Sequence, residues 1–139
     1  SSGWMQEWFG NSRVQNERIK EILVFSGLGH RFDDLAGNLS FGEQRRLELA
    51  RAIASKPKLV LLDEPAAGMN SDEVADLRQR ILDLKKLGLT VLLVEHVMEL
   101  VMNVVDRIVV LNFGKKIAEG TPENIQNNED VQKAYLGGG

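Results

Sequence analysis

The sequence contains no cysteine, only three prolines and no long apolar run among its 139 residues. The absence of cysteine excludes disulfide bridges and thiolate metal sites, and it is compatible with a reducing compartment. The longest apolar runs, at 59–62, 91–94 and 108–111, are far shorter than the roughly 18 residues of a membrane-spanning helix. No signal-peptide pattern is visible at the start of the sequence. Any role at a membrane is therefore expected to depend on a partner protein.

A strong excess of charge of one sign is also missing. The 17 basic and 20 acidic residues give a formal net charge of -3, and no basic stripe supports nucleic-acid binding. Hydrophobic residues make up 43% of the chain and charged residues 27%, which suffices for a packed core and disfavours disorder. The length fits one domain or a piece of one.

Apolar spacing predicts helices that alternate with short apolar strands. The predicted helices cover residues 14–26, 40–55, 71–86, 97–104, a stretch from 121, and 130–135. Strands are predicted over 58–62 and 90–94, and their unbroken apolar character is typical of strands buried on both faces of a parallel sheet. A hairpin is predicted over 107–119 and a loop over 30–39. The alternation indicates an α/β fold with a mostly parallel sheet.

The start of the helix at 40–55 has two features of interest. Ser40 and Glu43 fit a capping box, in which each side chain accepts a hydrogen bond from the other residue's backbone N–H. Gly42 lets a ligand approach the backbone closely, and the free amides of a helix N-terminus favour an anion. Taken alone, an ordinary capping box is the commoner interpretation of this pattern.

Two carboxylates, Asp63 and Glu64, follow the first predicted strand. Ligands bind at the carboxyl edge of open parallel sheets. There Asp63 can hold Mg²⁺, often through water, and Glu64 can deprotonate a water that attacks a γ-phosphate. A strand that simply ends in solvent is an equally good interpretation of these two residues alone. The ordered combination of the Ser40 helix and this strand is much more specific.

These residues resemble motifs of the ABC-type ATPases. Residues 39–44 resemble the signature motif, 59–63 the Walker B strand with Glu64 at the catalytic glutamate position, and 66–70 the D-loop, while His96 matches the switch histidine. The segments 64–70, 94–96, 120–123 and 127–136 are similar to the ATP-binding subunits of branched-chain amino-acid transporters. The resemblance covers about residues 18–136.

The resemblance implies a role for each matching residue. Ser40, Gly42 and Glu43 would face the ATP of the opposite subunit in a head-to-tail dimer, with Ser40 and Gly42 on the γ-phosphate. Asp63 would serve Mg²⁺, Glu64 would be the general base, and His96 would hydrogen-bond the γ-phosphate and the attacking water. Without the family, a single histidine after a strand is more often structural. His30 has no such context and is assigned to the loop.

Three departures from the family pattern stand out. Phe41 and Glu43 occupy positions that are glycine and glutamine in the general signature, although this branch often has an aromatic and a polar residue there. Val97 stands where the branch usually has an aspartate, which is expected to weaken the cap of the next helix. No G-x-x-x-x-G-K-[ST] loop and no Q-loop occur. The cradle for the β- and γ-phosphates is missing, so this chain alone is expected to be inactive.

The resemblance implies a partial P-loop NTPase fold. We expect an unassigned or tag-like segment at 1–13, part of the helical signature subdomain at 14–56, the C-terminal part of a RecA-like core at 57–120, and a helical tail at 121–139. The complete protein would use ATP and Mg²⁺ to energise branched-chain amino-acid import. Its partners would be a second ATP-binding subunit and membrane permease subunits, on the cytoplasmic face of the plasma membrane.

Two other functions remain open. The chain is alternatively a truncated, non-catalytic interaction module that keeps the dimer surface. An ABC ATPase of the DNA-repair or chromosome type is disfavoured, because coiled-coil heptads and basic surface runs are missing. Loss of the flanking strands would leave sheet edges and apolar surface exposed, so this chain alone is expected to self-associate.

Overall fold

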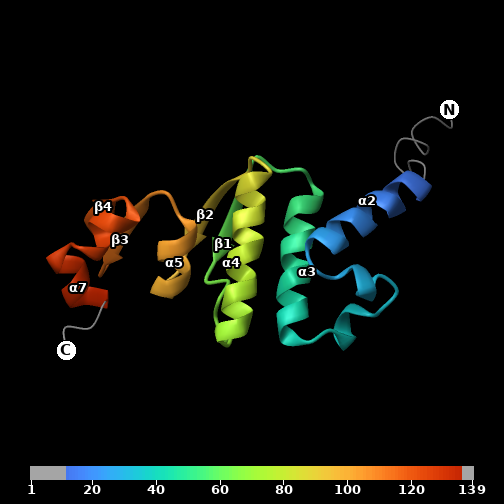
Figure 1. Ribbon diagram of the computed structural model, residues 1–139, viewed down its shortest axis with the longest axis horizontal. Coiled ribbons are helices and arrows are strands. Elements are labelled where there is room, and N and C mark those ends of the chain that lie inside the picture. The colour runs from blue at the N-terminus through green and yellow to red at the C-terminus, as the bar shows by residue number, and fades with distance from the viewer. Residues whose placement is uncertain (1–11, 136–139) are drawn as a thin grey trace. The chain divides into compact units, whose positions relative to one another are not determined.

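The computed structural model describes residues 12–135 (Figure 1). Residues 1–11 of the unassigned segment 1–13 lie outside this range, as do the closing glycines. The described elements are α2 (Ser12–Phe25), η1 (Gly29–Arg31), η2 (Ala36–Asn38), α3 (Phe41–Ala54), β1 (Leu59–Asp63), α4 (Ser71–Lys86), β2 (Thr90–Val94), α5 (Met98–Val104), β3 (Ile108–Asn112), β4 (Lys115–Gly120), α6 (Pro122–Gln126) and α7 (Glu129–Tyr135).

The predicted helices and strands are confirmed to within one or two residues at each end. The expected loop at 30–39 is wrong in part, because it overlaps the 3₁₀ helices η1 and η2. Each is only three residues long and is closed by short-range bonds such as Leu39 N–H to Ala36 O at 3.3 Å. So short a turn leaves no apolar periodicity in the sequence from which it could be predicted.

The chain divides into two compact units. Of the described residues, the first unit contains 12–61 together with Leu84–Leu92, and the second contains Leu62–Asp83 and 93–135. Within residues 12–135, no helix is both long and apolar enough to cross a membrane.

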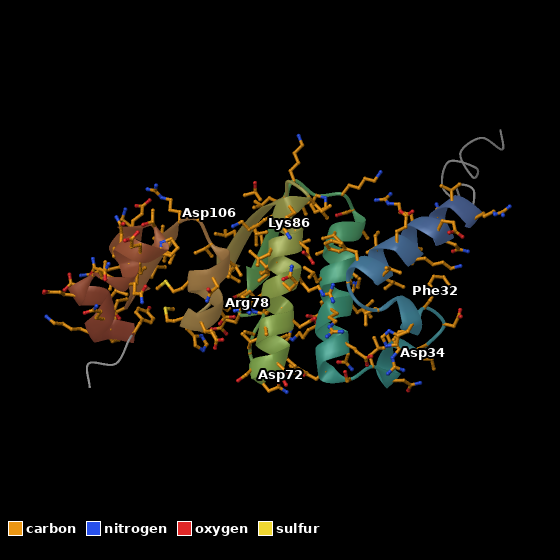
Figure 2. All side chains as sticks on the ribbon, in the orientation of Figure 1. Phe32, Asp34, Asp72, Arg78, Lys86 and Asp106 are labelled. Carbon is orange, nitrogen blue, oxygen red and sulfur yellow. The ribbon has the colours of Figure 1, made fainter. Side chains whose placement is uncertain are left out.

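In the first unit, a hydrogen bond joins α2 to α3 and a cation–π contact joins α2 to Phe32, the residue after η1. The Arg18 guanidinium donates to the Ala54 carbonyl at the end of α3, at 2.6 Å. The Lys20 ammonium lies 5.1 Å from the ring centre of Phe32, which is labelled in Figure 2. The buried apolar side chains of this unit include Leu28, Leu39, Leu49, Ala50, Val60 and Leu84.

Strands β1 and β2 form a two-stranded sheet. Thr90 N–H donates to Lys58 O at 3.0 Å and Glu64 N–H donates to Val94 O at 2.7 Å, so the strands run in the same direction, as predicted. The expectation that both faces are buried is wrong. Val60 is buried, but the alternating side chains of Leu59, Leu61 and Leu92 are exposed. Since residues alternate between the faces of a strand, one apolar face is uncovered within the described chain.

In the second unit, the predicted hairpin is confirmed. Strand β3 pairs antiparallel with β4, and the Asn112–Lys115 pair encloses a two-residue turn with positive φ at both Phe113 and Gly114, as in type I′ turns. Helix α7 is tied to this sheet because the Tyr135 hydroxyl donates to the Leu111 carbonyl. A small core joins the hairpin to the helices after it and comprises Val110, Ile125 and Val131, with Met102, Ile108, Ile117 and Ala118 packed against them.

Candidate functional site

The structure brings Glu64 and His96 together at the carboxyl edge of the β1–β2 sheet. Glu64 follows β1, His96 lies two residues after β2, and the Glu64 Oε1 atom is 3.4 Å from His96 Nδ1. Their side chains are 56% and 64% exposed, respectively, so a ligand in solvent can reach both. A carboxylate beside an imidazole at an open sheet edge suits general base catalysis on a bound water.

The backbone at Glu64 is unusual. Its φ of +46° lies in the left-handed region, which is uncommon for residues other than glycine. Two hydrogen bonds hold the conformation, from Glu64 N–H to Val94 O at 2.7 Å and from Ala67 N–H to Glu64 O at 3.1 Å. Such strain persists only where the surroundings fix it, and it concentrates at functional sites.

Glu95, between β2 and His96, was not identified from the sequence. Its carboxylate is fully buried and binds backbone N–H groups on both sides of the site. Oε2 accepts from Ala66 N–H at 3.0 Å, and Oε1 accepts from His96 N–H at 2.9 Å and from Val97 N–H at 3.4 Å. Oε1 also lies 3.7 Å from His96 Nδ1.

Asp63, the expected Mg²⁺ residue, is the exposed last residue of β1. Among the described residues, no group of three or more His, Cys, Asp or Glu side chains could hold a metal ion. A single carboxylate nevertheless fits Mg²⁺, which commonly takes one or two carboxylates and completes its octahedron with water and substrate phosphates. Within the described residues, Asp63 would therefore need ligands from elsewhere, such as nucleotide phosphates and water, to hold Mg²⁺.

In the first unit, the predicted capping box at the start of α3 is confirmed. Glu43 N–H donates to Ser40 Oγ at 3.3 Å, and Ser40 N–H donates to Glu43 Oε2 at 2.9 Å. Ser40 itself is exposed, while Gly42 is half-buried in the first turn. The amides of this turn and the exposed Ser40 hydroxyl could face an anion.

Arg31 of η1 supports this helix start, and the sequence did not indicate it. Its guanidinium donates to both Glu43 oxygens, at 2.9 Å and 3.4 Å, and also to Asp34 at 2.9 Å, a residue labelled in Figure 2. His30, assigned to a loop from the sequence, lies in η1 with Nε2 3.5 Å from Glu43 Oε1. Both Glu43 oxygens are thus engaged within the protein, which holds the signature turn in place.

Val97 begins α5 without a side-chain cap. This agrees with the expected effect of the missing aspartate at that position. The Val97 N–H is instead bound by Glu95, the residue two positions before it. The turn at the start of α5 is therefore held by the carboxylate of Glu95, which directly follows β2.

The Glu43 carboxylate is expected to make stability depend on pH. The Ser40 N–H and then the Arg31 guanidinium lower the pKa of Glu43 from 4.5 to about 2. A lowered folded-state pKa stabilises the fold at pH above the unfolded value and is lost as pH falls through the folded value. Glu43→Gln should therefore be less stable than the parent chain at neutral pH, and the difference should shrink between pH 4.5 and about 2.

Chemical denaturation across this pH range measures the difference in the free energy of unfolding. Arg31→Gln removes one partner of the same carboxylate, so it should also be less stable at neutral pH, and this difference should shrink over the same pH window. A difference that stays constant from pH 7 to pH 2 would show that the charge of Glu43 contributes nothing.

Comparison with known proteins matches the chain to families of ATP-binding cassettes. The sequence model of the family described as "ABC transporter" matches residues 4–67, and that of "Branched-chain amino acid ATP-binding cassette transporter" matches residues 115–139. The high-affinity branched-chain amino acid transport ATP-binding protein BraF of Pseudomonas aeruginosa is 53% identical over 73% of this chain and 40% of its own length. LivG of Salmonella typhimurium, described by the same phrase, is 49% identical over 90% of this chain and 51% of its own.

Solved structures agree with these sequence matches. An ATP-binding cassette of an ABC transporter in its ADP conformation superposes with a TM-score of 0.79 at 35% identity, over 87% of this chain and 49% of that one. A nucleotide-free cassette gives a TM-score of 0.79 at 32% identity, over 96% and 55% of the two chains. The chain thus spans about half the length of the relatives that it matches.

The fold and the motifs are those of part of an α/β cassette of the P-loop NTPase class. The chain belongs to the ABC transporter family. Within that family it is similar to the ATP-binding proteins of branched-chain amino acid transport.

Proposed function

We propose that the complete protein containing this chain hydrolyses ATP to power the import of branched-chain amino acids. The observation that carries this proposal is the Glu64–His96 pair, 3.4 Å apart at the carboxyl edge of parallel strands. The two branched-chain transport relatives, at 53% and 49% identity, support the choice of substrate class.

In this proposal Glu64 is the general base and His96 orients the reaction. Glu64 takes a proton from water as that water attacks the γ-phosphorus, and the bond from phosphorus to the bridging oxygen of ADP breaks. His96 hydrogen-bonds the γ-phosphate and the attacking water. Asp63 would hold Mg²⁺, which would supply charge neutralisation on the phosphates.

The start of α3 serves a different nucleotide in this proposal. Ser40 and Gly42 present hydroxyl and backbone groups to the γ-phosphate of ATP bound on the opposite subunit of a head-to-tail dimer. Glu43 supports this surface from behind, since Ser40 and Arg31 occupy both of its oxygens. We place the protein at the cytoplasmic face of the membrane, where permease subunits would anchor it.

The test compares this chain with the complete protein carrying a phosphate-binding loop. Isothermal titration calorimetry of this chain should show Mg-ATP binding weaker than about 1 mM, because no backbone cradle or lysine holds the phosphates. The complete protein should bind Mg-ATP and release phosphate. If the complete protein releases none, it is the non-catalytic interaction module instead. Micromolar binding by this chain alone would contradict the assignment of its missing phosphate site.

The exposed apolar face of β1 and β2 predicts self-association of this chain when it is produced alone. Leu59, Leu61 and Leu92 are at least half exposed on neighbouring strands, and uncovered apolar surface favours pairing between copies. Sedimentation velocity at high concentration should show dimers or larger species. Leu61→Lys, which places a charge on that face, should shift the distribution toward monomer. A strict monomer at every concentration would refute the prediction.

A further inference from the structure

The mechanism proposed above leaves one buried charged group unused. The Glu95 side chain is 0% exposed, although it lies between an exposed strand end and the exposed His96. Burying a carboxylate is costly unless hydrogen bonds replace its water shell, and apolar side chains fill space at lower cost. The carboxylate therefore requires a reason beyond packing.

The first contact of Glu95 reaches the segment after β1. Oε2 accepts from Ala66 N–H, two residues beyond Glu64, at 3.0 Å. On the other side of Glu64, its own N–H is bound to Val94 O at 2.7 Å. Two hydrogen bonds to consecutive residues thus hold this segment. Glu64 N–H is bound by Val94, and Ala66 N–H is bound by Glu95.

The second set of contacts reaches the segment after β2. Oε1 accepts from the backbone N–H groups of His96 and Val97, and the same atom lies 3.7 Å from His96 Nδ1. Since Val97 provides no side-chain cap for α5, Glu95 supplies the polar contact that fixes this turn. One carboxylate therefore fixes the backbone of His96 and that of the turn beyond Glu64.

We propose that Glu95 is a positioning residue that sets the distance and orientation between Glu64 and His96. The proposal rests on the function proposed above, because it assumes that these two residues act together. Both Glu64 Oε1 and Glu95 Oε1 face His96 Nδ1, which favours the imidazole tautomer with its proton on that nitrogen. The Nε2 atom can then accept a hydrogen bond from the attacking water, whereas a hydrogen bond to the γ-phosphate requires the imidazole to carry a proton on both nitrogens.

Two substitutions separate this role from simple packing. Glu95→Gln keeps size and shape, but its amide NH₂ must face either the Ala66 N–H or the His96 N–H, so one side of the bridge is lost. Glu95→Asp keeps both acceptor oxygens on a side chain that is one methylene shorter, so it cannot span both sides. Glu99→Gln, which removes the same charge from an exposed position four residues away, is the matched control.

Steady-state ATP hydrolysis of the complete protein is the first measurement. Misplacing catalytic groups by about 1 Å costs up to about 100-fold, so Glu95→Gln and Glu95→Asp should lower kcat by about 10- to 100-fold and leave KM for Mg-ATP within about threefold. Glu99→Gln should behave like the parent protein. A kcat within twofold of the parent for Glu95→Gln, or a fall in kcat matched by an equal rise in KM, would overturn the inference.

The second measurement does not require activity. The ¹⁵N resonances of the His96 imidazole, assigned through His96→Gln, should shift in Glu95→Gln and stay in place in Glu99→Gln. If the parent protein hydrolyses no ATP, the proposed function fails while this measurement still tests the link between Glu95 and His96. Unchanged His96 resonances in Glu95→Gln would overturn the inference independently of catalysis.

Discussion

Glu64→Gln in the complete protein is expected to lower the rate of ATP hydrolysis by about 10²- to 10⁴-fold while ATP remains bound. The amide keeps the size of the carboxylate and its ability to hydrogen-bond, but it cannot take a proton from the attacking water. The structure places the side chain 3.4 Å from His96 and leaves it open to solvent, so the substitution needs no repacking.

Phosphate release and equilibrium binding of Mg-ATP measure the two halves of this prediction. Glu99→Gln is again the matched control and should keep the parent rate. If Glu64→Gln hydrolyses ATP within tenfold of the parent, another group is the base. If it also loses ATP, Glu64 contributes to binding more than to chemistry.

Adding Ser40→Arg to Glu64→Gln is expected to abolish an ATP-dependent dimer. Without hydrolysis, the Glu64→Gln protein should accumulate as a dimer that encloses two ATP molecules. Ser40 is exposed and caps α3, and arginine there would block the approach of the partner's γ-phosphate and remove the Oγ acceptor. The nucleotide bound to each chain's own phosphate loop should stay in place.

Size-exclusion chromatography with and without ATP tests this effect. Ser55→Arg is the control, because it adds the same bulk and charge at an exposed position just after the other end of α3. Only Ser40→Arg should return the protein to a monomer. If both double variants form dimers as well as Glu64→Gln does, Ser40 does not act across the interface.

The order of helices and strands was predictable because it follows from local pattern. Apolar spacing predicted α2 and α3, a capping box and a closing glycine predicted α4, and the unbroken apolar runs predicted β1 and β2. The Ser40–Glu43 capping box was predictable because both partners lie within one turn of helix. The 3₁₀ helices were missed because a three-residue turn has no period.

Burial could not be predicted in the same way. The runs at Leu59–Asp63 and Thr90–Val94 read as strands covered on both faces, yet Leu61 and Leu92 are exposed. An apolar side chain indicates that burial is favourable, but it does not show which segment covers it. The described part of the chain does not cover this face. Coverage is a property of neighbouring segments, so a strand's own sequence cannot establish it.

By itself, the sequence determined the elements, the family and the residues with chemically suitable side chains, among them Asp63, Glu64 and His96. The tertiary structure alone showed that Glu64 and His96 meet, that Arg31 holds Glu43, and that Glu95 bridges two segments 29 positions apart. Motifs and caps depend on residues close in sequence, whose spacing is visible in the chain. These contacts depend on strands pairing and loops turning back, and only folding brings such distant residues within hydrogen-bonding distance.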